Sequence, residues 1–140
     1  MPPHYHCSSP MVFFDEGSAV IKAQPRQQLA SAFSSTEICG YARFTDPRSR
    51  LAVNVIGHTD KAGSDAANEQ LALRRAEAVA QVLVELGVPR ESICISGSGS
   101  RLPLANVAGA VPQNRRVELI FWGQTQASEV LAKCTRRPSN

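Results

Sequence analysis

The chain has 140 residues, and 43% of them are hydrophobic, which is enough for one domain with a single buried core. The formal net charge is only +3, and the few aromatic residues are not interleaved with basic ones as in proteins that bind single-stranded nucleic acid. We therefore expect no nucleic-acid partner. The longest apolar runs are far shorter than the roughly 20 residues of a membrane span. Any contact with a membrane would use segments absent from this chain.

The first residues carry no apolar h-region, so no export signal is visible in the chain. No apolar segment precedes Cys7 either, and we expect this cysteine not to be lipidated. Four cysteines allow three full disulfide pairings, and the residues are equally compatible with one disulfide and with none. They are Cys7, Cys39, Cys94 and Cys134. Their wide spacing is unlike that of a zinc site, and we expect no metal or other cofactor.

The first half of the chain predicts one strand and one helix. After an irregular lead-in, residues 11–15 form a short apolar strand. A helix follows over about residues 19–34, although Pro25 can delay its regular part. Residues 36–50 then form a polar loop that is longer than most connections in a compact domain.

The second half predicts a long helix among three strands. Residues 51–56 are largely apolar, as expected for a strand on a sheet face that helices cover. Ser64 or Asp65 can cap a helix that begins at about Ala66 and ends at Gly87, where a left-handed cap satisfies the last carbonyls. The remaining predicted segments are a strand over residues 92–96, a glycine-rich turn over 97–100, an irregular stretch to Pro112 and a strand over 116–122.

The order of these elements is strand, helix, strand, helix, strand and a closing strand. It predicts an α/β fold, an α+β sandwich in which helices cover a small mixed sheet. We expect the domain to span residues 12–122, after the irregular lead-in over residues 1–11. Residues 123–140 are polar and basic, and we expect them to form a partly disordered tail.

Arg75 is the most informative residue because it interrupts an apolar helical face. The helical period places it on one face with Leu71, Val79, Val82, Leu83 and Leu86. A guanidinium keeps its charge, so burying it without a partner would cost several kcal/mol. Asp60 follows the preceding buried strand and is the expected partner. Together the two side chains could hold the ammonium and the carboxylate of an amino acid.

Several short motifs occur in the order and spacing of one known family. They are Gly57-His58-Thr59-Asp60, Gly63, Asn68, Leu71, Arg75-Ala76, Val79 and Asn114-Arg115-Arg116-Val117-Glu118. Over roughly residues 12–121 the chain resembles the OmpA-like C-terminal domain. This peptidoglycan-binding module also occurs in peptidoglycan-associated lipoprotein and in MotB-type stator proteins. The resemblance implies a βαβαββ fold and a location in the periplasm, associated with the outer membrane.

The resemblance also implies a function and a set of residues. It implies a non-catalytic module that binds the peptidoglycan stem peptide and anchors an envelope protein or assembly to the cell wall, with envelope proteins as further partners. Asp60 and Arg75 match the family positions that contact the diaminopimelate of that peptide. Arg75 could bind a carboxylate through two parallel hydrogen bonds. Thr59, Asn68 and Arg115 match positions beside the same site.

Other interpretations of these residues stay open. Asp60 and Arg75 could form a purely structural ion pair. Ala72 stands where the family commonly has a serine, and this departure keeps open a domain that binds a protein partner and has lost wall binding. Because side chains alternate along a strand, we expect at most one of Arg115 and Arg116 to face the site.

An enzyme is the weaker alternative, and we expect none. A hydrolase would use Cys94 or Ser98 with His58 and Asp60. However, Ser98 lacks the spacing of a nucleophile elbow, and Cys94 lies in an apolar strand where a buried thiol is the commoner state. For His58 we favour a hydrogen-bonded residue at a strand end, and for Gly57 a requirement for backbone freedom alone.

Overall fold

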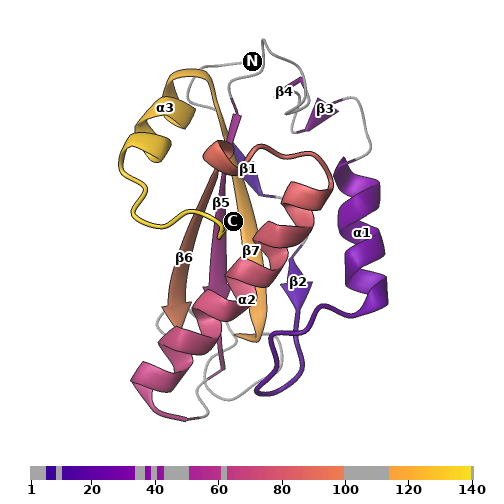
Figure 1. Ribbon diagram of the computed structural model, residues 1–140, viewed down its shortest axis with the longest axis vertical. Coiled ribbons are helices and arrows are strands. Elements are labelled where there is room, and N and C mark those ends of the chain that lie inside the picture. Colours follow the sequence, from indigo (N-terminus) through magenta and orange to yellow (C-terminus); the bar gives the residue numbers. More distant parts are fainter. Residues whose placement is uncertain are drawn as a thin grey trace.

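The structure, a computed structural model, describes residues 6–8, 11–33, 37–38, 41–42, 51–60, 63–99 and 114–139 (Figure 1). Its elements are β1 (His6–Ser8), β2 (Val12–Phe13), α1 (Ala23–Phe33), β3 (Glu37–Ile38), β4 (Tyr41–Ala42), β5 (Leu51–His58), α2 (Asp65–Glu85), η1 (Arg90–Ser92), β6 (Ile93–Gly99), β7 (Arg116–Gly123) and α3 (Gln124–Ala132). Within the loop that the sequence predicts over residues 36–50, β3 and β4 form an antiparallel pair, and residues 43–50 lie outside the described residues. The irregular stretch that the sequence predicts up to Pro112 also lies outside them from residue 100 on.

The main sheet is mixed, as the sequence predicts. Its strands lie in the order β1-β7-β5-β6, and β2 also pairs with β7. β5 and β6 are parallel, whereas β7 is antiparallel to β5, β1 and β2. Parallel neighbours need a crossover connection, and α2 provides it between β5 and β6. Figure 1 shows α2 crossing in front of the sheet, with α1 beside it.

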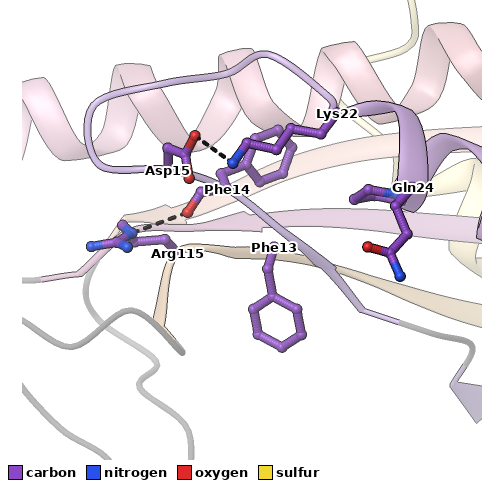
Figure 2. Close-up of a pocket in the computed structure, with 7 residues that line it drawn as sticks. Phe13, Phe14, Asp15, Lys22, Gln24 and Arg115 are labelled. Carbon is purple, nitrogen blue, oxygen red and sulfur yellow. Dashed lines mark hydrogen bonds and ion pairs between the residues drawn. The ribbon is translucent and has the colours of Figure 1, made fainter.

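The hydrophobic core lies between the sheet and these two helices. Val53 and Val55 of β5 and Phe121 of β7 are fully buried there, and the Phe121 ring lies 5.6 Å from that of Phe33 in α1. At the end of β2 the neighbouring residues Phe13 and Phe14 point to opposite sides of the strand, because side chains alternate. Phe14 is buried on the side of α2, and Phe13 points to the other side and is 47% exposed (Figure 2).

α2 begins and ends where the sequence predicts. Ser64 is the N-cap, and its hydroxyl accepts a hydrogen bond from the N–H of Ala67 at 3.2 Å. At the other end Gly87 has a φ of 100° and the N–H of Val88 donates to the carbonyl of Leu83 at 3.0 Å. Both ends of the helix that carries Arg75 are therefore fixed by local capping.

Gly57 is required for a different reason from the one predicted. Its φ is outside the left-handed region, so it has no special need for backbone freedom. Instead α2 lies so close to β5 that a Cβ at this position would be 1.8 Å from the carbonyl oxygen of Ala72. The prediction of conformational freedom was wrong here, and close packing of helix on strand is the cause.

The two ends of the chain are more ordered than the sequence predicts. His6–Ser8, expected to be irregular, form β1 and pair with β7. After residue 122, where the sequence predicts a partly disordered tail, α3 packs on β5 and β7 and the segment behind it contacts β6 and α2. There the N–H of Ile95 donates to the carbonyl of Arg136, and that of Ser139 to the carboxylate of Glu77.

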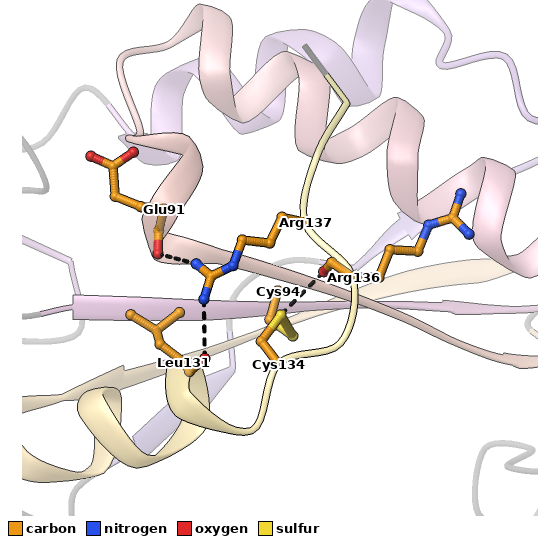
Figure 3. Close-up of a disulfide and its surroundings, with 6 residues drawn as sticks. All are labelled: Glu91, Cys94, Leu131, Cys134, Arg136 and Arg137. Atoms are coloured by element: carbon orange, nitrogen blue, oxygen red, sulfur yellow. Dashed lines mark hydrogen bonds between the residues drawn. A yellow bond between two sulfur atoms is a disulfide. The ribbon is translucent and has the colours of Figure 1, made fainter.

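A disulfide between Cys94 and Cys134 attaches this C-terminal segment to β6 (Figure 3). Figure 3 places α2 and α3 on opposite sides of the strands, so the segment after α3 passes the edge of the sheet to reach α2. Arg137 strengthens the attachment, since its guanidinium donates to the carbonyls of Glu91 and Leu131. The pairing is one that the sequence left open.

Removing this disulfide should destabilise the domain. It closes a loop with a sequence separation of 40 residues, so a variant with Cys94→Ser and Cys134→Ser should lose about 2–4 kcal/mol of unfolding free energy. Urea denaturation at equilibrium measures this loss. The double variant is preferable to a reducing agent, which would act on every cysteine. Unchanged denaturation midpoints would contradict the expected contribution.

Candidate functional site

The predicted site residues gather at the end of β5 from three segments. Thr59 and Asp60 follow β5, Asn68 and Arg75 belong to α2, and Arg115 precedes β7. Arg115 Nη1 lies 3.4 Å from Asp60 Oδ2, and the charge of Asp60 acts on Arg75. Asn68 approaches Gly99, whose carbonyl accepts a hydrogen bond from the N–H of Thr59 at 2.7 Å.

Arg75 is fully buried, and its hydrogen bonds go to backbone carbonyls. Nε donates to Ser18 at 2.8 Å, Nη1 to His58 at 3.0 Å and Nη2 to Asp15 at 3.0 Å. Its guanidinium also lies 5.3 Å from the ring centroid of Phe14. Arg75 therefore connects the loop after β2 to the end of β5. The prediction that it points inward is confirmed, but these hydrogen bonds join it to carbonyls and not to the expected carboxylate.

The charge of Arg75 is retained in spite of its burial. Burial lowers its pKa to about 10, and the neighbouring cations Arg115 and Arg74 act in the same direction. The carboxylate of Asp60 opposes them and raises the pKa. Arg75 thus stays protonated at neutral pH. Two of its five N–H groups have no acceptor among the described residues.

Asp60 and Arg115 form the more accessible part of the cluster. Their side chains are 10% and 18% exposed, and their 3.4 Å contact is long for a charge-assisted hydrogen bond. Arg115 Nε also donates to the carbonyl of Phe14 at 3.0 Å. Arg116 lies on the other face of β7, where it binds Glu118 and Asn114, so only one arginine of the pair faces Asp60, as predicted.

Two polar side chains of this cluster are buried without a hydrogen-bond partner among the described residues. Thr59 is 2% exposed and its Oγ1 makes no such bond, and Asn68 is 4% exposed with an unpaired Nδ2. Unpaired buried polar atoms are rare because each costs about 1–3 kcal/mol. The Thr59 hydroxyl and the Asn68 amide are therefore able to form hydrogen bonds with a polar ligand that reaches them.

His58 belongs to a separate buried cluster on the opposite face of the sheet. Its Nε2 lies 3.3 Å from Glu118 Oε1, yet neither ring nitrogen makes a hydrogen bond to a described residue. Burial and then the charge of Arg116 lower its pKa to about 4, while Glu118 opposes them. The ring is therefore neutral at pH 7, and the hydrogen-bonded state favoured from the sequence is absent within the described structure.

This shift predicts how stability depends on pH. Below about pH 6.5 His58 is protonated in the unfolded chain but not in the folded chain. The free energy of unfolding should therefore decrease as the pH is lowered from about 6.5 to 4, by at most about 1.4 kcal/mol per pH unit. Urea unfolding of the wild type and of His58→Gln across this range tests the prediction. The variant should show the shallower dependence, and parallel curves would contradict it.

The two nucleophiles of the hydrolase alternative are poorly accessible in the structure. The sulfur of Cys94 is bonded to Cys134, so this cysteine is not available as a nucleophile, and Ser98 is only 8% exposed. No cluster of three or more histidine, cysteine, aspartate or glutamate side chains in the described part of the chain could hold a metal ion.

The mixed sheet, the α2 crossover and the cluster at the end of β5 define a small OmpA-like α/β domain. The profile of the OmpA family matches residues 13–117, and the chain belongs to this family. Among curated relatives, probable lipoprotein YiaD of Escherichia coli is 34% identical over 110 residues, which are 77% of this chain and 46% of that protein. Outer membrane porin F of Pseudomonas fluorescens is 45% identical over 76 residues, or 53% of this chain and 23% of the porin. The chain thus spans less than half the length of these relatives.

Solved structures show the same fold. The peptidoglycan-associated lipoprotein of Burkholderia pseudomallei superimposes with a TM-score of 0.67 at 26% identity, over 81% of this chain and 90% of that one. The C-terminal domain of Helicobacter pylori MotB gives a TM-score of 0.63 at 22% identity, over 89% and 92% of the two chains. No helix in the described part of this chain is long and apolar enough to cross a membrane.

Proposed function

We propose that this domain binds peptidoglycan through the diaminopimelate of the stem peptide and anchors an envelope protein or assembly to the cell wall, without catalysis. The observation that carries the proposal is the cluster at the end of β5. It combines a partly exposed carboxylate and guanidinium, Asp60 and Arg115, with buried polar atoms on Thr59 and Asn68 that have no hydrogen-bond partner among the described residues. The name of the Burkholderia pseudomallei neighbour, a peptidoglycan-associated lipoprotein, supports the same ligand.

The chemistry of the cluster suits the end of a diamino acid. Asp60 accepts hydrogen bonds from its ammonium, and a guanidinium binds its carboxylate. Arg115 is the better placed guanidinium, because its long contact with Asp60 can be exchanged for a ligand carboxylate, whereas Arg75 is fully buried. In this proposal Arg75 holds the surrounding loops and adds positive charge from the protein interior. Thr59 and Asn68 add neutral hydrogen bonds.

The relatives also support a location and further partners. They include outer-membrane porins and lipoproteins by name, so we place this domain in the periplasm, next to the outer membrane. Its partners would be the cell wall and other envelope proteins.

Calorimetric titration of meso-diaminopimelate tests the proposal, at low salt because charge pairing dominates the site. We expect the wild type to bind and Asp60→Asn to lose at least about tenfold in affinity, since a hydrogen-bonded charge pair is removed. Glu129→Gln, an exposed residue of α3, makes the same charge change away from the cluster and should bind normally. A folded wild type that binds neither diaminopimelate nor the stem tripeptide would favour a protein partner instead.

A further inference from the structure

Cations gather where the segment after α3 crosses the edge of the sheet at β6. We call this group the basic patch, and its members are Arg90 of η1 and Lys133, Arg136 and Arg137 of the segment. The disulfide between Cys94 and Cys134 and the hydrogen bond from the N–H of Ile95 to the segment fix its backbone on β6. The fold therefore holds these charges close together in spite of their mutual repulsion.

No member of the basic patch has a carboxylate partner among the described residues. Two of them donate to backbone carbonyls, and the side chains of the other two, Lys133 and Arg136, meet no acceptor in the described ranges. Glu91 and Glu129 are exposed on the neighbouring elements, but neither lies within ion-pair distance of the patch. A carbonyl binds a guanidinium without compensating its charge, so the patch keeps its positive charge.

Exposed cations elsewhere in the described structure are mostly paired. Lys22 forms an ion pair with Asp15, and Arg26 forms one with Glu85, each at 2.9 Å. Outside the patch, Arg74 is the one exposed cation of the described residues that has no such carboxylate. Single exposed lysines and arginines need no explanation beyond solvation. The concentration of unpaired cations at one edge of the sheet instead indicates an anionic partner.

The patch lacks the apolar centre that protein interfaces usually have. The large apolar side chains that the described surface exposes are Met11, Phe13 and Val20, and they lie at or beside β2, which β7 and β5 separate from β6. In Figure 3 the side chains of Arg136 and Arg137 extend in opposite directions along the sheet edge. This spread suits an extended anionic surface better than a single phosphate group or a protein partner.

We propose that the basic patch binds peripherally to the anionic phospholipid headgroups of a membrane. The choice of a lipid surface rests on the location proposed for the domain, next to the outer membrane. Charges alone hold such a contact, so it differs from the expectation that contact with a membrane would use segments absent from this chain. Salt screens this attraction.

The membrane contact and the proposed diaminopimelate site use separate surfaces. Cys94 holds the segment of the patch near the start of β6, and Gly99 accepts the hydrogen bond of Thr59 at its other end. The two positions are about 17 Å apart at the rise of an extended strand. One domain can therefore bind the cell wall and a lipid surface at the same time.

Co-sedimentation with lipid vesicles tests the proposal. The wild type should bind vesicles of equal parts phosphatidylcholine and phosphatidylglycerol at low salt, dissociate at high salt and ignore vesicles of phosphatidylcholine alone. Each cation near an anionic surface strengthens binding about fivefold. Lys133→Gln combined with Arg136→Gln should therefore lose about 25-fold in the partition coefficient. Both side chains are exposed, so urea denaturation should show an unchanged stability.

Arg26→Gln combined with Arg74→Gln is the matched control, because it makes the same change in net charge outside the patch. This variant should bind the vesicles like the wild type. Equal losses in the two double variants would overturn the patch, since net charge alone would then drive binding. A wild type that ignores the anionic vesicles at low salt would also overturn it, and an acidic protein would become the better partner.

The titration with diaminopimelate separates this proposal from the proposed function. Lys133→Gln combined with Arg136→Gln should bind diaminopimelate as the wild type does, because neither residue reaches the cluster at Asp60. If vesicles bind through the patch and diaminopimelate does not bind, the patch stands and the wall-binding function fails. If diaminopimelate binds and the vesicles do not, only the membrane contact is wrong.

Discussion

Replacing Arg75 with alanine should lower the free energy of unfolding by about 3–5 kcal/mol, a large fraction of the stability of a small domain. The guanidinium donates to the carbonyls of Asp15, Ser18 and His58. Without it, these acceptors lose their charged donor, and a cavity remains under the ring of Phe14. The loop after β2 would then lose its main attachment to the end of β5.

Two further substitutions sharpen this prediction. Arg75→Lys keeps the charge but offers a compact ammonium in place of a planar guanidinium, so we expect an intermediate loss of about 1–3 kcal/mol. Arg74→Ala removes an exposed arginine from the preceding position, and we expect a change within about 0.5 kcal/mol. Urea denaturation followed by circular dichroism compares the three. Equal losses for Arg74→Ala and Arg75→Ala would contradict a structural role for the buried guanidinium.

This structural role affects how ligand binding should be tested. A variant at Arg75 that fails to bind would not identify a ligand contact, because the cluster around it would be rearranged as well. Asp60 and Arg115 are less deeply buried, and their substitution disturbs fewer contacts. Ligand binding is therefore best tested with substitutions of Asp60, and stability with substitutions of Arg75.

The sequence predicted the main architecture because the longest elements have clear patterns. The apolar face of α2, its N-cap at Ser64 and the glycine after its end are all local signals, and the structure confirms them. The inward direction of Arg75 followed from the same helical period. The acceptors of its hydrogen bonds could not be predicted, because every residue has a carbonyl and only the fold decides which of them converge on one guanidinium.

The C-terminal segment was missed for a related reason. Its polar composition is typical of a disordered tail, and the contacts that order it join residues far apart in the sequence. Cys134 bonds to Cys94, and the side chains of Gln81 and Arg90 donate to the carbonyl of Ser139. Such long-range contacts leave no periodic pattern in the amino-acid sequence.

Gly57→Ala should destabilise the domain by more than about 4 kcal/mol, the largest effect that we predict. The new Cβ would lie 1.8 Å from the carbonyl oxygen of Ala72, and the backbone of a helix cannot yield as a side chain can. The helix would have to move away from β5, which opens the core. Arg75 is about one turn after Ala72 in α2, so the same movement would draw its guanidinium away from the carbonyl of His58.

Gly97 provides the matched control for this prediction. It pairs with Gly57 in the register of β5 and β6, but the nearest atoms to a Cβ there would be Leu73 Cγ at 3.1 Å and Ala72 Cβ at 3.2 Å. The Leu73 side chain can rotate, and α2 would have to yield at Ala72 by only a few tenths of an ångström, so Gly97→Ala should cost about 1–2 kcal/mol. Urea denaturation of both variants tests the difference. Similar losses at the two glycines would mean that α2 adjusts to the added methyl group, and that its close approach to β5 is not required for the fold or for the position of Arg75.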